Sequence, residues 1–252
     1  MKKILVTGGS GFIGENLISK LIRNNKYRIF NLDKLSYASN WKSKISKQLG
    51  DLYTLLNVDL INALEVKKVI SQINPDVVIH LAAETHVDKS IKNPINFINT
   101  NIVGTFNLLE AVTANWKRNF SFKKEFKFIH VSTDEVFGSL DNSGFFSEET
   151  SYNPRSPYSS SKASSDHLVN SWYHTYDLPV IITNCSNNYG PGQHYEKLIP
   201  KIILNSILGF EIPLYGNGQN IRDWIFVEDH VDALITIMNN GIIGEKYCIG
   251  AN

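Results

Sequence analysis

The residues with the clearest capacity for chemistry are a tyrosine and a lysine in the run Tyr158-Ser-Ser-Ser-Lys162. On a helix this spacing places both side chains on one face, one turn apart. A lysine ammonium at that position favours the phenolate, so the pKa of Tyr158 is expected to fall from its free value of about 10 towards its working range. Such a pair can take a proton from a substrate hydroxyl. An ordinary half-buried tyrosine beside a solvated lysine would produce the same string.

A second acid–base couple precedes this pair, in the triplet Thr133-Asp134-Glu135. The triplet follows an apolar run that indicates a strand, and open α/β sheets bind ligands at the carboxyl ends of their strands. Two couples suit a reaction in which an oxidation enables a further proton transfer. Acidic residues after a strand also cap helices or lie in solvent. Asp134 and Glu135 can face one cavity only if the backbone turns directly after the strand.

A glycine-rich turn near the N-terminus has the pattern of a dinucleotide-binding site. Gly9, Gly11 and Gly14 fit G-x-G-x-x-G, and Gly8, Gly11 and Gly14 fit the wider G-x-x-G-x-x-G, between a predicted strand and a predicted helix. The N-terminus of that helix offers free N–H groups and a positive dipole end to phosphates. Asp33, 19 residues beyond Gly14, would accept hydrogen bonds from both ribose hydroxyls and repel a 2′-phosphate, which favours NAD over NADP. Alternatively, Asp33 only caps a turn.

Strands and helices alternate along the chain, which predicts an α/β fold with a doubly wound, mostly parallel, Rossmann-like sheet covered by helices on both faces. The predicted strands cover residues 3–7, 27–32, 53–58, 76–81, 126–132 and 179–185. The predicted helices cover residues 12–24, 62–72, 94–117 and 158–176, with shorter ones near 197–208 and 229–240. After residue 186 the loops become rich in Gly, Pro and Asn. We therefore expect an NAD-binding domain over residues 1–186 and an incomplete, smaller C-terminal substrate lobe over 187–252.

The composition indicates a soluble globular protein and excludes several classes. The chain has 252 residues, a hydrophobic content of 42% and a formal net charge of +1, so it lacks the field that attracts nucleic acids. No apolar stretch approaches the ~20 residues that span a bilayer, and Lys2-Lys3 leads into a strand rather than a signal peptide. Cys185 and Cys248 are far apart and lack metal spacing, so buried thiols in a cytoplasmic protein are expected, with no metal site.

Six motifs make the sequence recognisable: TGGSGFIG, LAAETHVDKSI, VSTDEVFG, YSSSKA, NNYGPGQHYEKLIP and GNGQNIRDWIFVEDH. They resemble the nucleotide-sugar 4,6-dehydratases of the extended short-chain dehydrogenase/reductase family, and they cover essentially the whole chain. The Asp-Glu pair after the threonine discriminates, because related 4-epimerases carry the Tyr and Lys but usually lack that pair. The resemblance implies a lyase that uses NAD and leaves it unchanged after each turnover.

The resemblance also implies a role for each catalytic residue. Tyr158, assisted by Lys162 and Thr133, removes the proton of the sugar 4-hydroxyl while hydride leaves C4 for NAD. The resulting 4-ketone acidifies the C5 hydrogen, which Glu135 takes, and Asp134 protonates the departing 6-hydroxyl. Hydride then returns to C6 and a proton to C5, which gives a 4-keto-6-deoxy sugar nucleotide. Like-charge repulsion between Asp134 and Glu135 helps to raise one of their two pKa values.

The same resemblance assigns further residues to the ligands. The NAD site would comprise Gly8, Gly11, Phe12, Ile13, Gly14, Asp33, Lys34, Asp59, Leu60, Leu81, Ala82, Ala83, Thr100, Tyr158, Lys162 and Asn188. The nucleotide-diphosphate sugar would meet Thr85, Thr133, Asn187, Lys197, Leu198, Pro213, Tyr215 and Arg222. Lys197 and Arg222 suit a diphosphate, although surface charge explains Lys197 equally well and an ion pair with Asp223 would explain Arg222. Asp59 could instead cap the helix at 62–72, and packing alone would explain the two alanines.

The helices at 94–117 and 158–176 resemble those of a four-helix dimer interface, so a homodimer is expected. Burial against the sheet would produce the same apolar stripes. Family members continue for about eighty to a hundred further residues, a size that completes a second lobe. Three alternatives stay open: a 4-epimerase, a dehydratase of UDP-sugars, and a non-catalytic NAD-binding remnant. The sequence does not decide between thymine and uracil in the substrate.

Overall fold

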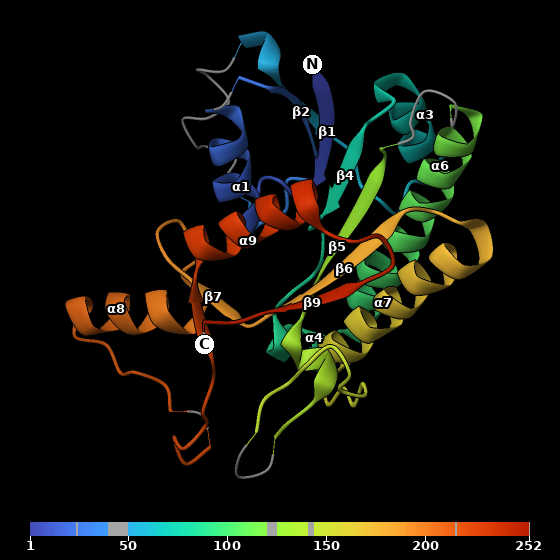
Figure 1. Ribbon diagram of the computed structural model, residues 1–252. Helices are drawn as coiled ribbons and strands as arrows, with labels where there is room; N and C mark the ends of the chain where they lie inside the picture. The colour runs from blue at the N-terminus through green and yellow to red at the C-terminus, as the bar shows by residue number, and fades with distance from the viewer. Residues whose placement is uncertain (24, 40–49, 120–124, 141–143, 215, 252) are drawn as a thin grey trace.

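A seven-stranded parallel sheet forms the centre of the computed structural model (Figure 1), in the order β3-β2-β1-β4-β5-β6-β9. The structure describes residues 1–23, 25–39, 50–119, 125–140, 144–214 and 216–251. The strands are β1 (Lys2–Thr7), β2 (Tyr27–Asp33), β3 (Tyr53–Asn57), β4 (Val77–His80), β5 (Lys127–Thr133), β6 (Val180–Cys185) and β9 (Lys246–Ile249). The strand order changes direction at β1, as it does in doubly wound sheets. The predicted fold class is therefore confirmed, and the six predicted strands are present.

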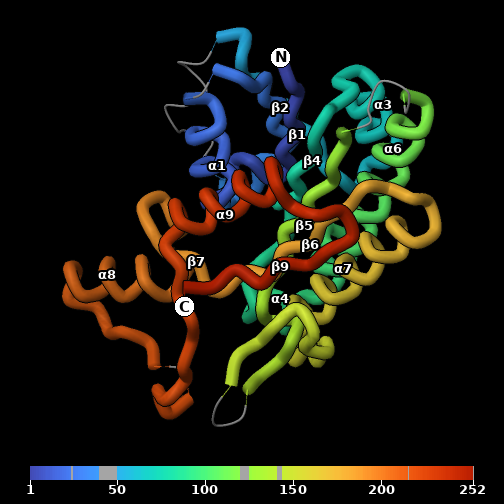
Figure 2. Tube along the Cα trace, viewed as in Figure 1, coloured from blue at the N-terminus to red at the C-terminus, as the bar shows by residue number. Residues whose placement is uncertain are grey.

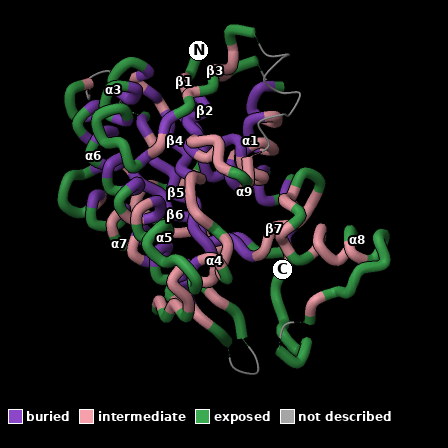
Figure 3. Tube along the Cα trace, turned by 180° about the vertical axis from the view of Figure 1, so that it is seen from behind, coloured by how far each residue is buried: buried purple, intermediate pink, exposed green. Residues whose placement is uncertain are grey.

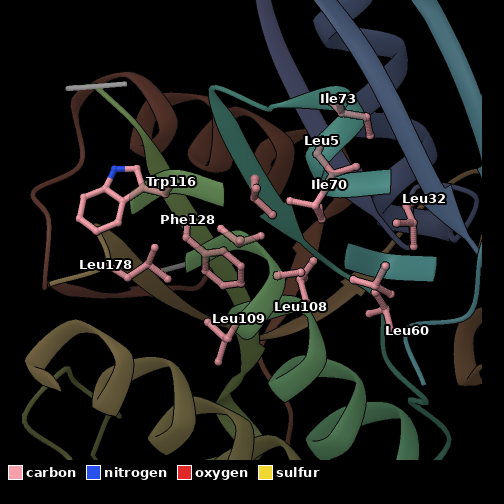
Figure 4. Close-up of a cluster of buried hydrophobic side chains, with 14 of the residues drawn as sticks. Leu5, Leu32, Leu60, Ile70, Ile73, Leu108, Leu109, Trp116, Phe128 and Leu178 are labelled. Carbon is pink, nitrogen blue, oxygen red and sulfur yellow. The ribbon is translucent and has the colours of Figure 1, made fainter. Parts of the chain in front are cut away.

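Helices cover both faces of the sheet because its strands are apolar on both sides. Ile4 and Val6 pack with α1 (Phe12–Ile22) and α9 (Val227–Asn240) on one face. Leu5 points the other way, as expected for successive residues of a strand, and packs with α3 (Ala63–Ile73), α6 (Gly104–Arg118) and α7 (Pro157–Tyr176). Figure 4 shows this second cluster, in which Phe128 of β5 lies near Leu108 and Leu109 of α6. These two layers fix the strand ends where the candidate site lies.

The predicted helix over residues 94–117 is present as one continuous helical stretch, which a π-helical segment divides into three parts. They are α5 (Pro94–Phe97), a wider π-helical segment η2 (Ile98–Val103) and α6. Within η2 the buried Asn101 side chain accepts from the backbone N–H of Glu84 at 2.8 Å and donates to its carbonyl at 3.1 Å. A π-helical turn of this kind commonly marks a functional region. The short helix α4 (Val87–Lys92), which precedes α5, was not predicted.

Residues after 186 divide between two places. The short strands β7 (Asn187–Tyr189) and β8 (Trp224–Phe226) pair in parallel, and α8 (Leu198–Leu208) buries none of its residues. Figures 2 and 3 show α8 extending away from the sheet, with the C-terminus beside β7. In contrast, α9 contacts α1, and β9 adds an edge strand next to β6. The division at residue 186 stays a prediction, and the chain returns to the sheet after it.

Cys185 is buried and Cys248 is only half-buried, which corrects the expectation that both would be buried, and both are free thiols. Among the described residues, no helix combines the length and apolar character that crossing a bilayer requires.

Candidate active site

The glycine-rich turn lies between β1 and α1 and is tightly packed. Gly8 has a φ of +70°, and a Cβ at this position would come within 2.6 Å of the Cα and N of Ala82. A Cβ on Gly14 would lie 2.5 Å from the carbonyl oxygen of Gly8. Gly11 caps α1 without any side-chain hydrogen bond, so the first N–H groups of the helix have no side-chain partner there. Such a turn suits a pyrophosphate that approaches the backbone closely.

Asp33 ends β2 beside this turn, and its carboxylate is largely buried. One oxygen accepts from the backbone N–H of Ser10 at 3.0 Å; the other accepts from the N–H of Leu35 at 2.7 Å and from the hydroxyl of Ser39 at 3.3 Å. The contact with Leu35 is the turn cap that the sequence left open as an alternative. A carboxylate has about four acceptor positions, so Asp33 can hold the turn and still accept from a ribose hydroxyl. These residues fit the adenosine end of NAD.

Other predicted cofactor residues come together at the neighbouring strand ends. The ammonium of Lys34 donates to Glu84 at 2.8 Å and to the hydroxyl of Thr100 at 3.3 Å. Asn62, and not Asp59, caps α3, because its side chain accepts from the N–H of Glu65. The remaining members are half-buried Phe12 and Ile13 at the start of α1, half-buried Asp59 and buried Leu60 after β3, and half-buried Leu81, Ala82 and Ala83 after β4. The assignment of these residues to an NAD site remains a prediction.

The triplet Thr133-Asp134-Glu135 changes direction at the end of β5. Asp134 and Glu135 lie in a short 3-10 helix, η4 (Asp134–Phe137), which bends the chain away from the strand direction. Both side chains are half-buried rather than exposed. The hydroxyl of Thr133 donates to Asp134 at 3.2 Å and accepts from the N–H of Glu135 at 3.3 Å. The required change of backbone direction is therefore present.

Tyr158 and Lys162 begin α7 and face the same strand end. Both are buried, and the Thr133 hydroxyl is near enough to that of Tyr158 to favour its phenolate and oppose the rise of its pKa. Lys162 donates from Nζ to the carbonyl oxygen of Val131 in β5, at 2.9 Å. Helix α7 begins sharply because Ser156 and Ser159 form a capping box ahead of it. The five predicted catalytic residues thus meet at one edge of the sheet.

Burial dominates the electrostatics of these groups. It raises the pKa of Tyr158 well above its usual value, and the nearby Glu135 raises it further. The expectation that Lys162 would lower this pKa is therefore wrong for this structure, in which the Lys162 ammonium contacts Val131 and burial lowers its own pKa. Burial also raises the pKa of Asp134, and burial together with Asp134 raises that of Glu135.

Two basic residues of the predicted substrate set surround the carboxylates. Lys197 donates from Nζ to the carbonyl and hydroxyl oxygens of Thr85, at 2.9 Å and 3.3 Å. Burial lowers the pKa of Lys197, against the opposing effect of Glu196 and Glu135. Arg222 is exposed and donates to the carbonyl of Ile221, and its charge lowers the pKa of both Asp134 and Glu135. Both cations therefore lie where a diphosphate next to the carboxylates could meet them.

The rest of the predicted substrate set is spread over the C-terminal part of the chain. Asn187 donates to the carbonyl of Asp223, and Asn188 of the NAD set lies next to it with its side chain against Ser186 and His230. Leu198 begins α8 and is exposed, and Pro213 is half-buried beyond that helix. Tyr215 lies outside the described residues.

Sequence reasoning missed two polar groups near the site. Glu196 joins Tyr37 and Lys89 from distant segments. Asp166 lies buried in α7 behind Lys162. The sequence did carry a signal for Asp166, because Asp166 follows Lys162 at the helical spacing that also separates Lys162 from Tyr158.

Comparisons with known proteins agree with this geometry. The sequence profile of the family described as GDP-mannose 4,6 dehydratase matches residues 5–252. The chain belongs to this family. A dTDP-glucose 4,6-dehydratase of Neisseria meningitidis serogroup B is 52% identical over 254 residues, which cover 100% of this chain and 72% of that protein. The predicted resemblance to nucleotide-sugar 4,6-dehydratases is thereby confirmed.

Two solved structures of dTDP-glucose 4,6-dehydratases share the fold. The Bacillus anthracis protein, in complex with NAD, has a TM-score of 0.87 and 43% identity, with 100% of this chain and 76% of that chain covered. The Streptomyces venezuelae protein, also with NAD bound, has a TM-score of 0.90 and 37% identity, with 98% and 75% covered. This chain of the dehydratase family thus spans about three quarters of each relative.

Proposed function

We propose that this chain is an NAD-dependent hydro-lyase that converts dTDP-glucose into dTDP-4-keto-6-deoxyglucose. One observation carries the proposal: η4 turns Asp134 and Glu135 to the strand end where Thr133 meets the buried Tyr158. A simple dehydrogenase needs only the tyrosine and lysine, whereas loss of water across C5–C6 needs a further acid and a further base. The relatives named above carry this activity in their names.

The residues around the glycine turn fit NAD and would hold it in a fixed orientation. The lack of side chains at Gly8 and Gly14 lets the turn pack tightly at the uncapped start of α1, and Asp33 retains acceptor capacity for a ribose hydroxyl. Lys34 and Thr100 lie at the same end of the site. Bound in its oxidised form, NAD would supply a hydride acceptor for the sugar C4 and, once reduced, a hydride donor for C6.

Tyr158 acts as the base for the sugar 4-hydroxyl. Its pKa is high because it is buried near Glu135, so it needs both Thr133 and a cation to release its own proton at neutral pH. Thr133 donates to Asp134 in this structure, and rotation of the hydroxyl would let it donate to substrate or to Tyr158 instead. Lys162, one turn further along α7, would have to leave the Val131 carbonyl to supply that cation.

Asp134 and Glu135 carry out the elimination once C4 is a ketone. The C5 hydrogen becomes acidic enough for a carboxylate only when the carbonyl can delocalise the charge. Glu135 takes this proton, and Asp134 gives a proton to the departing 6-hydroxyl. Burial raises the pKa of both groups, and Asp134 raises that of Glu135 further, so the pair retains one proton more readily than two isolated carboxyls.

Lys197 and Arg222 neutralise the diphosphate of the substrate. Lys197 is held on Thr85, and both cations act on the carboxylates that would face the sugar. Asn187, Leu198, Pro213 and Tyr215 complete the proposed substrate set in the lobe at 187–252. A near-neutral chain with two free thiols suits a cytoplasmic enzyme of small molecules rather than a partner of nucleic acids or membranes.

We also propose a homodimer formed through the helices within 94–117 and 158–176. Support comes from apolar side chains that these helices leave exposed: Ile95, Ile98, Val103, Phe106 and Tyr176. An exposed apolar patch of this kind is typical of a protein interface.

The test of the proposed function is incubation of the NAD-loaded chain with dTDP-glucose, followed by the alkali-induced absorbance of a 4-keto-6-deoxy sugar. Product is expected from the wild type and is expected to fall at least about a hundredfold in Glu135→Gln, the loss typical of a missing general base. A 4-epimerase would instead yield the C4 epimer and tolerate Glu135→Gln. UDP-glucose, assayed in parallel, tests the base preference. A chain that binds NAD but does not bind dTDP-glucose in a calorimetric titration would be a non-catalytic remnant.

A further inference from the structure

The end of β5 runs past the strand on one side of it. β4 ends at His80, which pairs with His130, so residues 131–133 of β5 extend beyond it. The carbonyl oxygen of Thr133, the last of these residues, accepts a hydrogen bond from Nδ2 of Asn184 in β6, at 3.1 Å. A side-chain amide therefore binds the backbone at the point where β5 becomes η4.

The amide of Asn184 has one favourable orientation. Asn184 is 2% exposed, and its Nδ2 also donates to Oδ2 of Asp166 at 3.3 Å. A carbonyl oxygen can only accept, and the Asp166 oxygen already accepts from the hydroxyls of Ser132 at 2.8 Å and Tyr152 at 2.9 Å. A reversed amide would place its oxygen against these two acceptors, so the nitrogen must face them.

The contact with Thr133 sets the direction in which the chain leaves β5. The peptide bond between Thr133 and Asp134 is planar, so the carbonyl oxygen of Thr133 and the N–H of Asp134 lie in one plane. Nδ2 of Asn184 holds that plane from the carbonyl side. The same threonine begins η4 through its hydroxyl, which accepts from the N–H of Glu135 at 3.3 Å and donates to the Asp134 carboxylate at 3.2 Å. Asn184 thus acts on the backbone unit from which both proposed catalytic carboxyls project.

A separate segment holds the other end of η4. The carbonyl oxygen of Val136 accepts from the backbone N–H of Asn153 at 2.9 Å, and a Cβ on Gly138 would lie 2.4 Å from the carbonyl oxygen of Asn153. These are backbone contacts with the loop before α7, which a change at Asn184 leaves in place. Loss of the Asn184 amide should therefore loosen the start of η4, which carries the two carboxyls, and spare its end.

We propose that Asn184 is a positioning residue for the reaction: its buried amide fixes the peptide plane at the end of β5 from which η4 brings Asp134 and Glu135 to the site. The inference rests on the proposed function, because the two carboxyls receive their roles there. Asp166 anchors the amide, and the amide anchors the turn. A buried carbonyl oxygen that lost this donor would be left unsatisfied, which favours a different path of the chain.

Replacement of Asn184 by apolar residues of two sizes tests the role in turnover. Asn184→Leu fills the space without a donor, so kcat should fall about tenfold to a hundredfold, the effect of a displaced catalytic group. Asn184→Ala leaves room for a water that can donate to both acceptors, so kcat should fall less than about tenfold. A side chain that only fills space would give the reverse order, because the smaller residue leaves a cavity. The Kd for NAD should stay within about threefold in both variants, since the glycine-rich turn lies on other strands.

Asn115→Leu is the matched control. Asn115 in α6 is also buried, at 7% exposed, and its Nδ2 donates to the side chain of Asn74, ahead of β4, at 3.0 Å. This variant should lose stability as Asn184→Leu does, but it should keep kcat within about twofold of the wild type. An equal loss of kcat in both, or the reverse order of the two Asn184 variants, overturns the proposal. A failure of both Asn184 variants to fold also overturns it, because Asn184 would then support the whole sheet.

Amide hydrogen exchange tests the role without turnover and so separates it from the proposed function. In Asn184→Leu, exchange of the N–H groups of Asp134 and Glu135 should rise by about fivefold or more, the factor that one ordinary hydrogen bond contributes. The neighbouring strand β4 should not share this rise. No rise at Asp134 and Glu135, or an equal rise in β4, overturns the proposal. The expected pattern in a chain that forms no 4-keto-6-deoxy product would support Asn184 as the anchor of η4 and contradict only the proposed function.

Discussion

The carboxylate of Asp33 accepts a hydrogen bond from the backbone N–H of Ser10, at 3.0 Å, and so joins the end of β2 to the glycine-rich turn. The two segments that would meet the pyrophosphate and the ribose are therefore one unit before any ligand binds. Because Asp33 also accepts from the N–H of Leu35, its carboxylate is held in a single orientation. Pre-organisation of this kind reduces the free energy that binding spends on ordering the site.

Replacement of Asp33 should weaken NAD binding specifically. Asp33→Asn removes a charged acceptor for a ribose hydroxyl, and hydrogen bonds to charged groups contribute about 1.5–3 kcal/mol, so Kd should rise about tenfold to a hundredfold. The preference for NAD over NADP should narrow as well, because the repulsion of a 2′-phosphate disappears. Fluorescence titration with both cofactors measures this. Ser39→Ala is the matched control, since it removes only the 3.3 Å contact to the same carboxylate, and an equal loss in both variants would contradict the assignment.

Gly8 should be far less replaceable than another glycine of the same backbone conformation. Gly8 and Gly209 both have φ of +70°, but a Cβ on Gly209 meets nothing within 4 Å, whereas one on Gly8 would overlap the backbone of Ala82. Gly209→Ala should cost about 1–2 kcal/mol of unfolding free energy from the left-handed backbone alone. Gly8→Ala should cost at least about 1 kcal/mol more from the overlap. Urea unfolding of the two variants measures the difference, which is absent if the turn can open freely.

The sheet and the turn at its edge could be predicted because local patterns encode them. Buried parallel strands are continuous apolar runs, and the glycines between β1 and α1 stand where a strand gives way to a helix. The helix over 94–117 was predicted, but the π-helical segment inside it was not; there the Asn101 side chain hydrogen-bonds to the backbone of Glu84, which comes from another part of the chain. Helical periodicity does not report such a contact.

The electrostatics of the candidate site could be predicted only in part. Spacing correctly placed Tyr158 and Lys162 on one helical face, but the direction of the Tyr158 pKa shift depends on burial and on Glu135, neither of which spacing reveals. Asp166 is visible on the same face in the sequence, yet the three donors to its carboxylate come from β5, β6 and a loop. Tertiary structure, rather than the motif itself, sets the charge states.

The two site carboxyls should make stability depend on pH in a defined direction. Folding raises the pKa of Asp134 and Glu135, mainly by burial, so their contribution is fully present below an unfolded pKa of about 4 and is lost as pH rises through the raised values. The wild type should therefore lose stability relative to Asp134→Asn/Glu135→Gln as pH rises above about 4. Urea unfolding at a series of pH values measures this, and a pH-independent difference would show that the carboxyls are solvated.

Glu196→Gln provides an internal control of opposite sign for that experiment. Burial alone would raise the pKa of Glu196, but the hydrogen bonds that its carboxylate accepts from Lys89 and Tyr37 outweigh this effect and lower the pKa. The contribution of Glu196 to stability is therefore present above the unfolded pKa of about 4 and is lost as pH falls through the lowered pKa of the folded state. The free energy of unfolding of the wild type, relative to that of Glu196→Gln, should grow as pH rises to about 4. Above that pH, the free energy of unfolding of the wild type should begin to fall relative to that of the Asp134/Glu135 variant.

The proposed dimer should depend on apolar side chains that the single chain leaves exposed. Phe106 of α6 is 42% exposed and lies edge-to-face against Trp172 of α7, at 5.9 Å between ring centroids. Phe106→Glu should shift the wild-type dimer to monomer in sedimentation experiments, because a charge at an apolar interface is strongly unfavourable. Leu64→Glu, at an 83% exposed position on α3, should leave the dimer intact. A wild type that stays monomeric at all concentrations would contradict the proposed interface.

Glu196 should slow the release of NAD by joining three segments around the site. Its carboxylate accepts from the hydroxyl of Tyr37, which follows β2, at 3.1 Å and from the ammonium of Lys89 in α4 at 2.8 Å. The Lys89 ammonium also lies 3.6 Å from the centre of the Tyr37 ring. Because these contacts are partly exposed, each is worth about 1 kcal/mol or less, so Glu196→Gln should speed NAD dissociation by up to about fivefold.

Stopped-flow release measures the rate, and hydrogen exchange should rise over residues 35–39 and 194–197 together. Tyr37→Phe keeps the ring beneath Lys89 and should change the rate less than twofold. A rise in exchange confined to one segment would show that Glu196 does not couple them.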